Sequence, residues 1–167
     1  MIDPGLAWAM SHVTAVDTGA RLENVVFLHL RREHGRLLHC EIAYYLTAAG
    51  REVDFVVGDL SEQRAGRLVQ ACTTLADPAT RTREVVALME AMAETGVTQA
   101  EIVTLHEEET IDTDAGAIRV VPAWRWLLEG RSHAAGAGGL VPRVKGKPPR
   151  RLRTGATGWH RVSVVDT

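Results

Sequence analysis

The sequence predicts one α/β (α+β) domain, in which a mixed sheet of about four to five strands is flanked by helices. Three observations support this fold class. A helical segment at 19–34 comes first, three β-rich segments follow it in succession, and a second helical segment begins at Asp77-Pro78. Two further β-rich segments follow, at 100–105 and 117–121. Three short strands in a row favour an antiparallel meander.

The first long helix is predicted by its apolar spacing. Within 19–34, Leu22, Val26 and Leu30 recur at the helical period, and Gly35 provides a stop. A shorter helix is expected before it, at 3–12, because Asp3 suits an N-cap and Pro4 suits the first helical position.

The second long helix has the same kind of start. Asp77 is the expected N-cap, Pro78 the first helical residue, and Gly96 the end. A final helix is expected to begin at Pro122, with Trp126 and Leu127 docked on the body of the domain.

The three strands of the predicted meander are "HCEIAYYLT" at 39–47, "EVDFVV" at 52–57 and "RLVQACTTL" at 67–75. Turn-like sequences separate them. After the strand at 100–105 comes the acidic stretch "HEEETIDTDAG", in which "HEEET" at 106–110 is expected to be a solvated turn rather than a calcium loop, since calcium-loop spacing is missing. Arg81, Arg83 and Glu84, early in the second long helix, are expected on its solvated surface, with partner contact as the second reading.

Composition fits one globular domain in a reducing compartment. The chain has 167 residues, of which 46% are hydrophobic and 24% charged. No apolar run reaches the roughly 18 residues of a membrane span, and the first residues do not have the pattern of a secretory signal. The two cysteines, Cys40 and Cys72, form no metal-binding pair. We therefore expect a cytoplasmic protein without a membrane partner.

Charge divides the chain into a body, 1–130, and a tail, 131–167. The tail holds eight basic residues against Asp166 alone, a balance of +7, while the body has a balance of −9. The tail is also rich in glycine and proline, which predicts disorder. Two other readings stay open: an arm that contacts nucleic acid, and a vector-derived or out-of-frame extension.

Three polar side chains lie in otherwise apolar, adjacent elements: Glu23 in the first long helix, Asp54 in the second strand and Gln70 in the third. Asp54 and Glu23, each taken alone, are most simply solvent-facing residues, whereas Gln70, in an apolar strand, needs hydrogen-bond partners if it is buried. Together, two carboxylates and an amide oxygen can hold a hard cation such as Mg²⁺, which prefers oxygen ligands. Such a cation activates water and stabilises charge on a phosphodiester.

The order of several segments resembles a known family. "LENVVFLHLRREHG", "EIAYYLTAAGREVDFVV", "LVQACTTLADPATRTREVVALMEA" and "EIVTLHEEETI" with "IRVVPAWRWLL" are similar to the C-terminal domain, of unknown function, of prokaryotic AAA+ family ATPases. The resemblance runs from about Asp3 to Leu128. It implies a PD-(D/E)XK restriction-endonuclease-like core, in which Glu23 matches the helix acid, Asp54 the metal-binding Asp, and Gln70 the Glu/Gln position.

The chain departs from this pattern two residues after Gln70. Cys72 stands where the family motif has a Lys, the cation that positions the attacking water and offsets developing negative charge. Arg51 or Arg67 could substitute from elsewhere, although nothing in the sequence places either in the site. We expect an impaired nuclease site.

The ATPase half of that family is not matched by this chain. A phosphate-binding loop needs G-x-x-x-x-G-K-[ST], but Pro148 follows Gly146-Lys147, and Val141 stands at the first glycine position. No ATP site is therefore expected in this chain, which resembles the C-terminal domain alone, as a stand-alone version or as a fragment.

Two functions follow as expectations. The first is a nuclease-fold accessory or interaction module of an AAA+ ATPase system, catalytically impaired, with DNA contact through the basic tail as a further partner. The alternative is a Mg²⁺-dependent DNA endonuclease that uses Glu23, Asp54 and Gln70, with Asp54 and Glu23 as the metal ligands.

Overall fold

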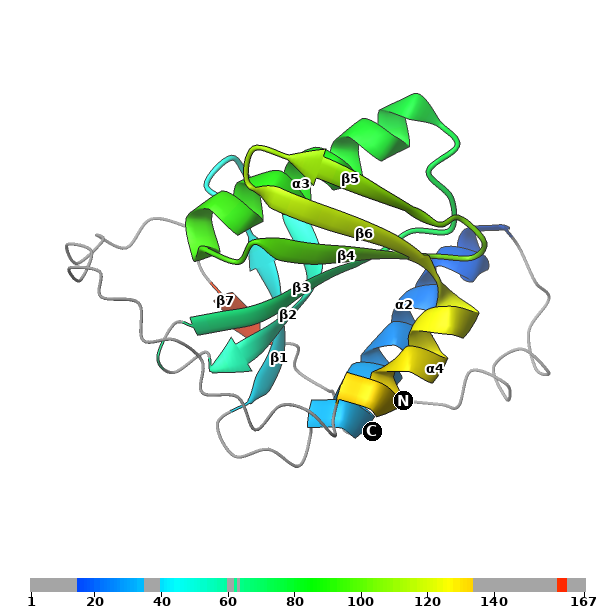
Figure 1. Ribbon diagram of the computed structural model, residues 1–167, viewed down its shortest axis with the longest axis horizontal. Coiled ribbons are helices and arrows are strands. Elements are labelled where there is room, and N and C mark those ends of the chain that lie inside the picture. Colours follow the sequence, from blue (N-terminus) through cyan, green and yellow to red (C-terminus); the bar gives the residue numbers. More distant parts are fainter. Residues whose placement is uncertain (1–14, 35–39, 60–61, 63, 134–158, 162–167) are drawn as a thin grey trace.

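The computed structural model describes residues 15–34, 40–59, 62, 64–133 and 159–161. Three helices and one sheet make up this part of the chain (Figure 1). The helices are α2 (Ala15–His34), α3 (Pro78–Thr95) and α4 (Ala123–His133). The strands are β1 (Glu41–Leu46), β2 (Glu52–Asp59), β3 (Arg64–Ala71), β4 (Gln99–Thr104), β5 (Glu109–Thr113), β6 (Gly116–Pro122) and β7 (Trp159–Arg161).

The sheet is mixed, as predicted, and has the strand order β5-β6-β4-β3-β2-β1-β7. The pairs β1–β2 and β2–β3 are antiparallel, which confirms the predicted meander. The pairs β3–β4 and β4–β6 are parallel, whereas β5 and β7 run antiparallel to their neighbours. With seven strands the sheet is larger than the four to five expected.

One of the additional strands, β5, lies in the acidic stretch for which a solvated turn was predicted. The prediction was wrong for Glu109 and Thr110, which pair with β6. β5 is an edge strand, and Ile111 is its one apolar residue that packs against the core. An edge strand with one apolar residue shows too weak an alternation to be recognised from sequence.

Helices cover both faces of the sheet. α3 packs on one face, over a core that includes Val56, Leu68 and Ile118. α2 and α4 pack on the other face, where Phe27 of α2 lies 6.4 Å from Phe55 of β2 between ring centroids. Figure 1 shows α2 (blue) and α4 (yellow) side by side, away from α3 (green).

α4 docks as predicted through Trp126, which is 1% exposed, and through the partly buried Leu127. The helix begins at Ala123 rather than at the expected Pro122, because Pro122 still pairs with Thr104 as the last residue of β6.

The ends of α3 confirm the expected capping residues. The Asp77 carboxylate accepts a hydrogen bond from the Thr80 N–H at 2.8 Å, and Pro78 is the first residue of the helix. Gly96 ends the helix with φ 77°, a left-handed conformation that costs least for glycine.

Acidic residues late in α3 hold the β1–β2 turn. Glu90 accepts hydrogen bonds from the Thr47 hydroxyl at 2.8 Å and from the Arg51 Nε at 2.9 Å. Glu94 accepts from the Tyr45 hydroxyl at 2.6 Å and from the Ala48 N–H at 2.9 Å. These bonds fix the start of β2, where the candidate site begins, against α3.

Parts of the predicted organisation lie outside the described residues. These are the helix expected at 3–12 and residues 134–158 and 162–167 of the tail. Within the tail, α4 continues to His133, and Trp159–Arg161 form β7 beside β1. Among the described helices, none is long and apolar enough to cross a membrane.

Candidate functional site

A polar cleft of about 430 Å³ lies where the ends of β2 and β3 meet α2 and α3. Glu23 comes from α2, Asp54 from β2 and Gln70 from β3. The fold therefore brings together the three residues singled out from the sequence. The other lining residues are Gly50, Arg51, Glu52, Ala71, Arg83, Glu84 and Ala87.

Asp54 and Gln70 meet at the point where β2 and β3 separate. The register of the two strands ends at Phe55 opposite Val69. Beyond it, the Asp54 N–H donates to the Gln70 Oε1 at 3.1 Å, and the Ala71 N–H donates to the Asp54 Oδ2 at 2.8 Å. Side-chain oxygens thus accept from these two backbone N–H groups, in place of the carbonyl oxygens that a continued ladder would supply. This role explains why β2, an otherwise apolar strand, carries the carboxylate of Asp54.

Glu84 of α3 completes the polar network and was missed as a functional residue. It is 5% exposed, so its predicted place on the solvated surface was wrong. One carboxylate oxygen accepts from the Gln70 Nε2 at 2.8 Å, and the other accepts from the Arg83 Nη2 at 2.5 Å. The spacing was a usable signal, because Glu84 precedes Leu88 by four residues on the buried face of α3.

Crowded carboxylates control the electrostatics of the cleft. Burial raises the pKa of Asp54 to about 7, although the hydrogen bond from the Ala71 N–H opposes the shift. The carboxylates of Glu23, Glu84 and Glu52 raise the same pKa further. The pKa of Glu23 is also raised, by burial first and then by Glu52 and Glu84. Asp54 therefore exchanges its proton near neutral pH, rather than in the acidic range usual for an Asp.

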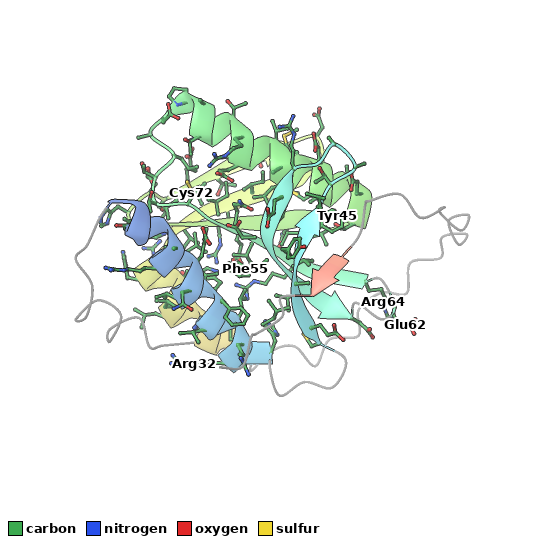
Figure 2. All side chains as sticks on the ribbon, turned by 180° about the vertical axis from the view of Figure 1, so that it is seen from behind. Arg32, Tyr45, Phe55, Glu62, Arg64 and Cys72 are labelled. Atoms are coloured by element: carbon green, nitrogen blue, oxygen red, sulfur yellow. The ribbon has the colours of Figure 1, made fainter. Side chains whose placement is uncertain are left out.

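Cys72 occupies the position where the resembled family has a Lys, and its side chain is in the core. It is 9% exposed, packs with the cluster under α3, and donates through its Sγ to the Thr74 carbonyl at 3.1 Å. Figure 2 labels it just beyond β3, on the connection to α3. Burial raises the pKa of its thiol, and Cys72 does not line the cleft.

The arginines considered as replacements for that Lys differ in their placement. Arg51 lines the cleft but is paired with Glu90, at 2.9 Å. Arg67 lies outside the cleft lining, pairs with Glu33 and Glu101, and stacks 5.2 Å from the Trp126 ring centre. Arg83, which was expected on the solvated surface of its helix and not considered as a replacement for the Lys, lines the cleft and is paired with Glu84.

The cleft fits a divalent cation only in part. Asp54 and Glu23 bring hard oxygen donors to one cleft, and a cation would relieve the repulsion between them. Within the described residues, however, no three His, Cys, Asp or Glu side chains are grouped closely enough to hold a metal ion. A cation would therefore depend on these two carboxylates and on water.

Comparison with known proteins gives one distant relative. The chain is 29% identical over 127 residues to the uncharacterized protein MJ1544 of Methanocaldococcus jannaschii. The match covers 72% of this chain and 27% of the relative, so the chain spans about a quarter of that protein's length. No family model matches the sequence, and no solved structure matches it.

Proposed function

We propose that this chain is a nuclease-fold accessory or interaction module of an AAA+ ATPase system, with an impaired catalytic site. The observation that supports impairment is the burial of Cys72 in the position of the family's Lys. A thiol turned into the core supplies no cation beside the carboxylates, where negative charge would develop during phosphodiester cleavage. The assignment to an ATPase system rests on the sequence resemblance.

The hydrogen-bond pattern of the cleft supports the same proposal. The Gln70 Oε1 accepts from the Asp54 N–H, and the Gln70 Nε2 donates to the Glu84 carboxylate. Both the oxygen and the nitrogen of this amide are therefore used in hydrogen bonds within the fold. The cleft arginines Arg51 and Arg83 are each paired with a carboxylate of α3. The polar residues of a nuclease-like core thus act here to join β2, β3 and α3.

A second candidate function is a Mg²⁺-dependent DNA endonuclease. It is favoured by the shared cleft of Glu23, Asp54 and Gln70. Asp54 and Glu23 would hold Mg²⁺, which, when bound, would supply a water of lowered pKa and a positive charge near the phosphate. Asp54 would have to lose its proton first, and its raised pKa makes that loss pH-dependent.

The proposed setting is the cytoplasm, with an AAA+ ATPase as partner. DNA contact is proposed through the basic tail, because the body, 1–130, has a net charge of −9. A reading frame for an ATPase directly upstream, and co-elution of the two purified proteins, would support the partnership. An upstream frame unrelated to ATPases, together with separate elution, would count against it.

The decisive experiment compares three forms of the full chain on labelled DNA with Mg²⁺ or Mn²⁺. We expect no cleavage by the natural chain and none by Asp54→Asn. Cys72→Lys tests whether the Lys alone restores activity, and it must be shown to fold because it places an ammonium group in the core. Metal-dependent cleavage by the natural chain that is lost in Asp54→Asn would overturn the proposal and establish the endonuclease.

A metal titration separates the two functions without relying on activity. A cation that binds only the folded protein raises its apparent stability. The endonuclease requires a thermal shift with Mg²⁺ or Mn²⁺ that Asp54→Asn and Glu23→Gln abolish. For the impaired module we expect no shift with either metal.

A further inference from the structure

The short strand β7 covers part of the edge of β1. β7 (Trp159–Arg161) is the last strand in the sheet order, next to β1, and Figure 1 shows it (red) as a short arrow on that side of the sheet. It pairs antiparallel with residues 43–45 of β1. On the other side, β2 pairs with β1 from Glu41 to Leu46. β7 therefore covers about half of the length of the β1 edge.

The sequence of β1 is typical of a strand that pairs readily. Its residues, "EIAYYL", include no proline or glycine, and its one charged residue is Glu41, at the start. Ala43 is the one residue of the strand that is buried. A short apolar segment of this kind pairs with other strands when its edge is open. β7 therefore protects β1 from such pairing.

The opposite edge of the sheet is protected in a different way. The edge strand β5 carries Glu109 and Asp112, and Glu109 forms an ion pair with Arg81 of α3. Charged side chains on an edge strand oppose pairing with another chain, because the charges would lose water. The middle of β1 contains no charged residue, so the β1 edge depends on β7 for its protection.

A second copy of β1 is complementary to this edge. Two β1 strands can pair antiparallel about a two-fold axis between Ala43 and Tyr44. No like charges then lie opposite each other, and both tyrosines of each strand lie opposite aliphatic residues of the other, which favours pairing. The arrangement is isologous, so it closes at two copies. The opposed residues are Glu41 with Leu46, Ile42 with Tyr45, and Ala43 with Tyr44.

We propose that the β1 edge is a docking surface for the β1 edge of a second copy, and that β7 is the internal strand that keeps this surface closed. Displacement of β7 lets two copies join in one continuous sheet. β1 then pairs over six residues rather than over the three that β7 covers. The residues of β1 are not among those that line the cleft, so this surface is independent of the proposed function.

Competition between the two strands sets the size of the effect. Both copies must open before they pair, so dimerisation weakens with the square of the open fraction. If β7 leaves about one edge in ten open, the natural chain dimerises about 100-fold more weakly than a chain in which β7 does not pair. A single strand pair is a small interface, so the dimer of the open form is concentration-dependent.

Sedimentation of the full chain over a concentration series tests the proposal. Alternate residues of an antiparallel strand donate to the partner, so Trp159→Pro combined with His160→Pro removes a backbone donor of β7 in either case. We expect this variant to dimerise about 100-fold more strongly than the natural chain. The matched control, Trp159→Tyr with His160→Thr, keeps both N–H groups and should remain monomeric, as the natural chain does.

Two outcomes of the sedimentation would overturn the proposal. One is a proline variant that is folded and stays monomeric at every concentration. The other is a natural chain and a control that dimerise as strongly as the proline variant, because β7 would then not close the surface. Circular dichroism checks the fold of each protein. His160→Pro and Trp159→Pro are also measured singly, and at least one of them must dimerise.

Hydrogen exchange locates the surface that joins the two copies. In the dilute proline variant, the amides of residues 41–46 should exchange faster than in the natural chain, because β7 no longer covers them. At concentrations where the dimer forms, the same amides should become protected again. A dimer in which their protection does not change with concentration would show that the copies join elsewhere, and would contradict the proposal.

Discussion

Asp54, Gln70 and Glu84 are best understood as one polar unit. Gln70 bonds to the Asp54 N–H and to the Glu84 carboxylate, and Asp54 in turn accepts from the Ala71 N–H. Such a network stabilises the fold only while every member is paired, because an unpaired buried polar group costs about 1–3 kcal/mol. The same three residues that resemble a nuclease site therefore also hold two strands and a helix together.

The raised pKa of Asp54 predicts a stability that falls as pH rises. The folded protein binds this proton with a pKa of about 7, above the ordinary value of 3.8. Proton binding at Asp54 therefore stabilises the folded state, and this stabilisation is complete below about pH 4. It is lost between about pH 4 and pH 7, and amounts to at most about 4 kcal/mol. Asp54→Asn should flatten this part of the profile in urea unfolding, whereas Asp112→Asn, at an exposed position on β5, should not.

Removal of Glu84 should destabilise the domain through its partners. Glu84→Ala leaves the Gln70 amide without its acceptor and the Arg83 guanidinium without its carboxylate, and we expect a loss of about 2 kcal/mol. Glu84→Gln keeps an acceptor for Gln70 and should lose less. Equal losses in the two variants, measured by chemical denaturation, would show that the negative charge of Glu84, and not its hydrogen bond to Gln70, holds α3 here.

At the scale of elements, α3 connects the candidate site to the rest of the sheet. Its first half supplies Arg83 and Glu84 to the cleft, and its second half holds the β1–β2 turn through Glu90 and Glu94. The helix therefore fixes both the floor of the cleft and the strand that carries Asp54. Its start is set by Asp77, at the N-cap.

Loss of the Asp77 cap should weaken the whole domain. Asp77→Ala removes the acceptor for the Thr80 N–H at 2.8 Å, and we expect a loss of about 1 kcal/mol in unfolding free energy. Asp77→Asn retains a capping oxygen and serves as the matched control. A loss of equal size in Asp77→Asn would show that the charge at the helix start, and not the hydrogen bond, is what matters.

At the scale of the whole molecule, two cores share one sheet. The core under α3 and the core under α2 and α4 use opposite faces of the same central strands, β2, β3, β4 and β6. A partly buried charge network borders the second core, in which Glu101 accepts from Arg67 and Arg119, each at 2.7 Å. These pairs keep the pKa of Glu101 low despite its burial, through Arg67 first and then Arg119.

Two tryptophans of α4 offer a matched test of this architecture. Trp126→Ala should cost about 3–5 kcal/mol, because it empties a fully buried site between α2 and the sheet. Trp124→Ala, two residues away on the exposed face, should cost much less. Thermal unfolding of the two variants checks the difference, and similar losses would mean that α4 is docked differently.

The sequence by itself determined the elements that carry strong local signals. The caps Asp77 and Gly96, the apolar stripe of α2 and the three strands of the meander are set by interactions within a few residues, so they were predicted correctly. Only the tertiary structure decided what depends on distant partners. The edge strand β5 exists because β6 supplies its hydrogen bonds, and Glu84 is buried because Gln70 and Arg83 satisfy its carboxylate. The inward orientation of Cys72 likewise follows from the packing of β3 under α3, which no local pattern encodes.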